Sequence, residues 1–95
     1  MSIGILTLEI QFTGCKSLKE KRSRIKPLLS RLHREFNVSV AELDRMDKWD
    51  ETIIGCVLIS NDHQFSHNAL QAIPHWLNKN WPEIMLVDDH IEIIN

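Results

Sequence analysis

The chain has 95 residues, 43% of them hydrophobic, so it can form one small domain with a single core, and we expect that domain to span residues 1–95. The formal net charge of −2 hides an uneven distribution: residues 16–36 carry eight basic and two acidic groups, and the rest carry three basic and eleven acidic groups. The overall charge therefore does not exclude an anionic partner. We expect no membrane-spanning helix, because no apolar run approaches the length that one needs, and no signal peptide, because the N-terminus lacks a basic head and a small-residue cleavage site.

A strand is predicted over residues 3–12, where apolar and polar side chains alternate. One face would carry Leu6, Leu8, Ile10 and Phe12, and the opposite face would carry Ile3, Ile5, Thr7, Glu9 and Gln11. A helix is predicted from Ser17 to Phe36, because Ser17 and Glu20 form a capping box and apolar residues then recur at helical spacing. Asn37 is expected to end this helix, since asparagine tolerates the left-handed backbone conformation.

Further strands are predicted over residues 38–44, 52–60 and 84–94, and a second helix over residues 63–80. The strand over residues 52–60 is apolar on both faces, which is typical of a central strand. The last strand should present on one side Met85, Val87, Ile91 and Ile93. The second helix should direct into the core Phe65, Ala69, Ile73, Trp76 and Leu77.

The predicted order of elements is β-α-β-β-α-β, an α+β arrangement of the ferredoxin-like kind. It implies a four-stranded antiparallel sheet with both helices on one face. Pro27 and Pro74 fall inside the predicted helices, where proline removes a backbone donor, so we expect a kink or a 3₁₀ turn at each. The alternative is that the two helices are broken into four short ones.

Several short segments together resemble the YlxP-like family of small bacterial proteins, a domain of unknown function. They are Gly14-Cys15, residues 17–22 (SLKEKR), residues 37–42 (NVSVAE), Asp44, Asp47, Trp49, residues 60–62 and residues 91–93. The resemblance covers nearly the whole chain and implies a ferredoxin-like fold, with Pro27 and Pro74 as departures from the family pattern. Genes of this family often lie beside those for transcription-elongation, translation-initiation and ribosome-maturation factors, which implies by association a role near RNA or the ribosome. It implies no catalytic residues.

The basic helix is the leading candidate for a binding surface. Lys19, Arg22 and Lys26 should lie along one flank of its apolar stripe, and Arg24 and Arg31 along the other, with Lys21 nearer the stripe. Cations at helical spacing can contact successive phosphates of RNA. The alternative is a solvated helix whose long side chains cover the edge of the core.

The sheet face away from the helices is expected to be aliphatic. It would carry Ile3 and Ile5 and one apolar face of the strand over residues 52–60, and it has no aromatic platform of the kind that binds RNA on a sheet. So apolar a surface favours a homodimer, with Ile3 and Ile5 in the interface.

The connection over residues 45–51 combines acidic residues with Trp49. Trp49, Asp44 and Asp47 could form a partner-binding site. The carboxylates of Glu42, Asp44, Asp47, Asp50 and Glu51 could instead form a divalent-cation site. The ordinary alternative is a polar turn with Trp49 folded onto the core, which we expect.

Nothing in the sequence predicts catalysis. His63 and His67 are spaced for two metal ligands but lack a third, and Cys15 and Cys56 lie outside any zinc or redox spacing. Cys15 precedes a helix beside two lysines, which would favour a reactive thiolate, although a buried, inert thiol is the expected state. We therefore expect no cofactor, no metal, no small-molecule ligand and no membrane partner, and a reduced, cytoplasmic protein.

The sequence thus supports two hypotheses. The first is a non-catalytic binding protein that contacts RNA or a ribosomal ribonucleoprotein through the basic helix. The alternative is a protein–protein interaction or regulatory module that acts as a homodimer, with the basic helix or the Trp49 loop meeting an acidic partner. An enzymatic site formed between the halves of a dimer is a third alternative.

Overall fold

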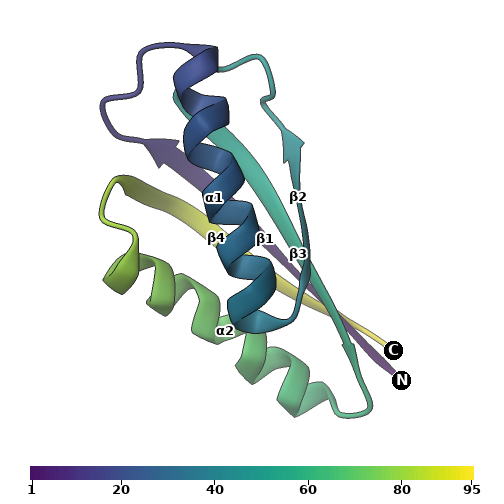
Figure 1. Cartoon of the computed structure of the whole chain (residues 1–95). Helices are drawn as coiled ribbons and strands as arrows, with labels where there is room; N and C mark the ends of the chain where they lie inside the picture. Colours follow the sequence, from purple (N-terminus) through teal and green to yellow (C-terminus); the bar gives the residue numbers. More distant parts are fainter.

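A computed structural model describes residues 1–95 and confirms the predicted β-α-β-β-α-β order (Figure 1). The elements are β1 (Ser2–Phe12), α1 (Leu18–Phe36), β2 (Ser39–Asp44), β3 (Glu51–Ser60), α2 (His63–Asn80) and β4 (Ile84–Ile94). The fold is an α+β, ferredoxin-like sandwich, as expected from the sequence.

The four strands form one antiparallel sheet in the order β2-β3-β1-β4. Both helices cover the same face of this sheet, and the opposite face is open (Figure 1). The chain termini lie together at one end of the sheet, because Ile3 of β1 pairs with Ile94 of β4. We call the uncovered side the open face.

The core lies between the helices and alternate residues of the two central strands. Leu6, Leu8, Ile10 and Phe12 of β1 are buried, as predicted, and Ile54, Cys56 and Leu58 are the buried residues of β3. The helices contribute Ile25, Leu28, Leu32, Leu70, Ile73 and Leu77. Ile53, Val57 and Ile59 therefore belong to the open face.

The inward face of α2 differs from the prediction. Phe65 is 59% exposed, whereas Ser66 and Leu70 are fully buried. A side chain at Gly4 would come within 2.7 Å of the Leu70 methyl group, so Leu70 fills the space that glycine leaves on β1. Ser66 can be buried because its hydroxyl lies 3.0 Å from that of Ser2 and 2.7 Å from that of Ser60, which satisfies all three groups.

Both helices are continuous through their prolines, so the alternative of four short helices is wrong, and no 3₁₀ segment interrupts either one. Pro27 lies on the exposed side of α1, where its ring meets solvent. The Ser17 hydroxyl accepts a hydrogen bond from the Glu20 amide at 3.1 Å, and Asn37 ends the helix with φ of 49°. Both predicted helix ends are therefore confirmed.

A β-bulge in β4 overturns the predicted face assignment of that strand. The pairing with β1 shifts between Glu9 and Ile10, and Val87 is the residue of β4 left without a partner. An extra residue inverts the alternation of side chains beyond it. Met85 therefore faces the open side, opposite Gln11, whereas Ile91 and Ile93 face the helices.

Burial makes the Cys56 thiol a pH-sensitive contributor to stability. Desolvation raises its pKa from 9.0 to about 12, so the folded protein holds a proton that the unfolded chain releases. The free energy of unfolding should fall as pH rises from 9 toward 12, by on the order of 1 to 2 kcal/mol between about pH 7.5 and about pH 10.5. Urea titrations at both pH values measure the difference. Cys56→Ala should lose less stability over the same interval, and an identical loss would contradict this assignment.

Candidate functional site

Six of the seven Lys and Arg residues of α1 fall into three groups, of which Lys21 is the first; the seventh, Arg34, is exposed in the last turn. This side chain is 1% exposed, and its ammonium donates hydrogen bonds to the carbonyl oxygens of Arg45 and Lys48, both at 2.7 Å. It also pairs with the Glu42 carboxylate at 2.9 Å, and the same carboxylate accepts a hydrogen bond from the Thr52 hydroxyl at 2.6 Å. Lys21 therefore ties α1 to β2 and to the connection between β2 and β3. The sequence places it next to the apolar stripe but does not name these partners.

Arg24 and Arg31 form the second group, whose guanidinium groups have partners within the chain. Arg24 donates hydrogen bonds to the carbonyl oxygens of Thr13 at 2.8 Å and Glu83 at 2.7 Å, and it lies over the Phe12 ring at 5.3 Å. Arg31 pairs with Glu35 at 3.0 Å and lies over the Trp76 ring at 5.3 Å. These contacts hold both guanidinium groups against the flank of α1 that faces α2 and the start of β4.

Lys19, Arg22 and Lys26 form the third group, which we call the cationic row. All three are exposed, and none makes an ion pair or a side-chain hydrogen bond within the chain. Their spacing of three and four residues places them on one stripe of α1, on the flank away from Arg24 and Arg31. The predicted set of five cations is thus divided into three free side chains and two that are engaged.

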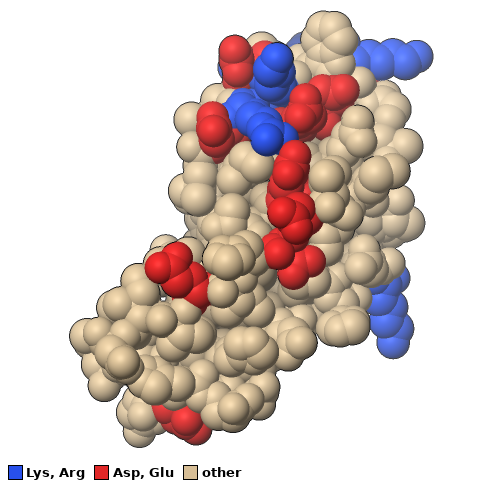
Figure 2. All heavy atoms as spheres, turned by 180° about the vertical axis from the view of Figure 1, so that it is seen from behind, with Lys and Arg blue, Asp and Glu red and all other residues tan.

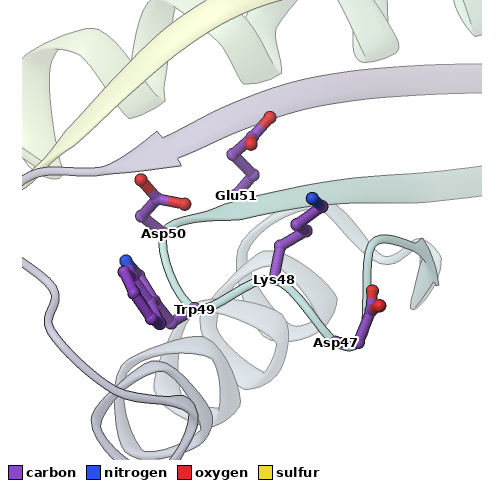
Figure 3. Close-up of a pocket in the computed structure, with 5 residues that line it drawn as sticks. All are labelled: Asp47, Lys48, Trp49, Asp50 and Glu51. Carbon is purple, nitrogen blue, oxygen red and sulfur yellow. The ribbon is translucent and has the colours of Figure 1, made fainter.

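The connection between β2 and β3 exposes Trp49, so the expectation that this indole folds onto the core is wrong. Trp49 is 55% exposed and borders an open hollow of about 350 Å³, lined by Asp47, Lys48, Trp49, Asp50 and Glu51 (Figure 3). The carbonyl oxygens of Arg45 and Lys48 turn inward to Lys21, which fills the space beneath the turn and leaves the indole outside.

The acidic residues around this loop are not gathered into one site. The Asp44 carboxylate accepts a hydrogen bond from the Arg45 amide at 2.7 Å, and the Asp47 and Asp50 side chains lie on either side of Lys48 (Figure 3). No group of three or more His, Cys, Asp or Glu side chains in this structure is placed to hold a metal ion. Cys15 is buried, with its sulfur 3.5 Å from the Ser17 carbonyl oxygen.

The open face of the sheet carries most of its charge at one end, which we call the charged end (Figure 2). At the charged end, Arg45 bridges Glu9 at 2.8 Å and Glu51 at 3.0 Å, and the hydrogen bond to Glu9 is the main cause that raises the pKa of Arg45. The other end, which we call the apolar end, lies near the termini and carries Ile3, Ile5, Val57, Ile59 and Ile94, with Glu92 opposite Ile5. The sequence shows the alternation that produces this face, but not the bridging position of Arg45.

These observations define a small ferredoxin-like domain with a cationic helix on one side and, on the other, a sheet face that is charged at one end and mainly apolar near the termini. No helix in it is long and apolar enough to span a membrane. The chain matches, over residues 3–91, the family described as "Protein of unknown function (DUF503)", and it belongs to that family.

One curated relative is the uncharacterized protein YlxP of Bacillus subtilis (strain 168), which is 33% identical over 82 residues, covering 86% of this chain and 88% of that protein. Among solved structures, a mutant of SnoaB, a cofactor-independent oxygenase from Streptomyces nogalater, matches with a TM-score of 0.48 and 15% identity. That match covers 99% of this chain and 91% of that chain, and it is too distant to support any argument about function.

The contacts of Lys21 lead to a stability prediction. Lys21→Met should lower the free energy of unfolding by about 3 kcal/mol, because it leaves the Glu42 carboxylate and two carbonyl oxygens without their cation. Urea denaturation followed by circular dichroism measures this change. Lys19→Met is the matched control, since an exposed lysine of the same helix should change stability by less than about 0.5 kcal/mol. Equal effects of the two substitutions would contradict the role given to Lys21.

Proposed function

We propose that this protein is a non-catalytic binding protein that contacts RNA, or a ribonucleoprotein of the ribosome, through the cationic row of α1. The observation that carries the proposal is that Lys19, Arg22 and Lys26 are exposed and without partners on a continuous helix. A helix holds such side chains at fixed positions, so they can meet phosphates with little ordering of the backbone.

The dimensions of the cationic row fit a nucleic-acid strand. Lys26 follows Lys19 by seven positions, which corresponds to about 10.5 Å along the helix axis at a rise of 1.5 Å per residue. One strand presents several phosphates over such a length. Contacts of this kind fix position and carry little sequence information, so we expect binding to depend on backbone shape more than on base identity.

The charge on the two sides of the molecule favours one orientation toward RNA. The strands of the open face carry Glu9, Glu51, Asp88 and Glu92 and no Lys or Arg, and Arg45 pairs with the first two, so a polyanion would be repelled there. Its β1 and β3 residues include no aromatic side chain on which a base could stack. The helix side is therefore the side that we expect to meet phosphate. The ribosomal setting itself rests only on the gene neighbourhoods of the family that the sequence resembles.

Binding to a labelled RNA stem-loop over a salt gradient tests the proposal. Three phosphate contacts should give a slope of about −2.7 for the logarithm of the association constant against the logarithm of the salt concentration, at about 0.9 for each contact. The double substitution Arg22→Gln and Lys26→Gln should reduce the magnitude of that slope by about 1.8 and weaken binding at low salt. Fluorescence anisotropy measures both quantities.

A variant of equal charge serves as the control. The double substitution Lys48→Gln and Lys79→Gln also removes two positive charges, but from parts of the chain outside α1. It should leave the affinity and the salt slope nearly unchanged. The proposal would be contradicted if the natural protein showed no salt-dependent binding. Equal losses of affinity in the two double variants would also contradict it, because RNA binding would then depend on net charge and not on the cationic row.

A protein-interaction module is the second candidate, favoured by the exposed indole of Trp49. Tryptophan is common at the centres of protein interfaces, and here it lies beside a hollow whose rim includes Asp47 and Asp50. Affinity capture from a bacterial lysate, with and without nuclease, separates the candidates. Partners lost after nuclease treatment support RNA, whereas partners that persist and disappear with Trp49→Ala support the loop.

A further inference from the structure

The apolar end of the open face is a surface that the fold leaves uncovered. Ile59 and Val57 of β3 are 68% and 39% exposed, Ile94 of β4 is 41% exposed, and Ile3 and Ile5 of β1 lie between these two strands. In Figure 2 no Lys or Arg lies at the corresponding end of the sheet, whose tan surface is interrupted by separate acidic groups, while Lys and Arg gather chiefly at the other end. An apolar patch of this kind on a small protein marks an interaction surface.

We infer that this end of the open face binds a second copy of the same chain, so that two sheets pack face to face. The distribution of charge favours a copy of the chain over a charged partner. The five side chains of the patch are apolar, so two copies can meet on them without repulsion as long as Glu92, the carboxylate opposite Ile5, stays at the margin of the contact. A charged partner gains no ion pair from these five side chains. Glu9, Glu51 and Asp88 lie toward the far end of the face, and Glu92 borders the patch at Ile5. The contact should therefore be centred on Ile3 and Ile59.

The edges of the sheet are less suited to pairing two copies. The β4 edge carries Asp88, Asp89 and Glu92 and is interrupted by the bulge at Val87, both of which oppose the addition of a strand. The β2 edge has only six residues and a bulge of its own. Because neither edge strand is suited to pairing with a second copy, we expect the two copies to associate through the open faces of their sheets.

The available area sets the expected strength of the dimer. Four strands about 4.8 Å apart and about 37 Å long give an open face of roughly 600 Å² in projection, against about 800 Å² per partner for a standard interface. Because the charged end cannot overlap with itself, only part of this face is usable. We therefore expect a reversible dimer with a dissociation constant in the micromolar range, near the weak end of specific interfaces.

This arrangement is independent of the proposed contact with RNA. Both helices cover the other face of the sheet, so a face-to-face dimer leaves each cationic row at an outer surface (Figure 1). Loss of RNA binding with an intact dimer, or the reverse, would separate the two proposals.

Sedimentation equilibrium tests the dimer over a range of protein concentration up to about 100 µM, where a weak specific interface should be occupied. The natural chain should approach twice its mass of 11.1 kDa, and Ile59→Glu should remain at 11.1 kDa. Ile59 is mostly exposed, so the substitution should not disturb the core. Phe65→Glu is the matched control, because Phe65 is 59% exposed on α2, and this variant should associate like the natural chain.

Three results would overturn the inference. They are a natural chain that stays monomeric at the highest concentration, an Ile59→Glu variant that still dimerises, and a folded Phe65→Glu variant that dissociates equally. Circular dichroism establishes that each variant is folded. If Ile59→Glu is not folded, Ile94→Glu supplies the same comparison, since that residue lies at the end of β4 and is also exposed.

Discussion

The buried ammonium of Lys21 is the contact on which the geometry of this domain depends. It joins a helix to a strand through Glu42 and to the following turn through the Arg45 and Lys48 carbonyl oxygens. A buried charge is tolerated only when its partners satisfy it, so all of these groups must be in place together. The rotation of α1 about its axis is therefore set by one polar site as well as by the apolar stripe.

Fixing that rotation also fixes where the other cations point. With Lys21 directed inward, Arg24 and Arg31 fall on the side of α2, where carbonyl oxygens and aromatic rings receive them. Lys19, Arg22 and Lys26 fall on the other side and meet only solvent. A sequence rich in lysine and arginine thus becomes a structure in which three cations of α1 stabilise the fold and three others remain free for a partner.

The elements of the fold could be predicted because each depends on local periodicity or on a cap, as in the alternation of β1 and the Ser17 capping box. The predictions of which side chains face the core were wrong where contacts between distant parts of the chain determine the packing. Phe65 is displaced from the core because Leu70 fills the gap over Gly4, and the faces of β4 are exchanged by a bulge that the sequence does not mark. For the candidate site, the positions of the cations on α1 could be predicted. Their partners could not, since Arg24 contacts Glu83, which is 59 residues away in the chain.

The pairing of Ile3 with Ile94 has a practical consequence for work with this protein. Both chain ends leave the sheet at the same corner, so a purification tag at either end begins beside the exposed isoleucines of that corner. The same proximity makes the chain suited to circular permutation, with a short linker joining the ends and a new opening in the exposed segment around Gly14. In such a molecule a loop would join β4 to β1 at the Ile3–Ile94 end of the sheet, and the new chain ends would lie at the opposite end.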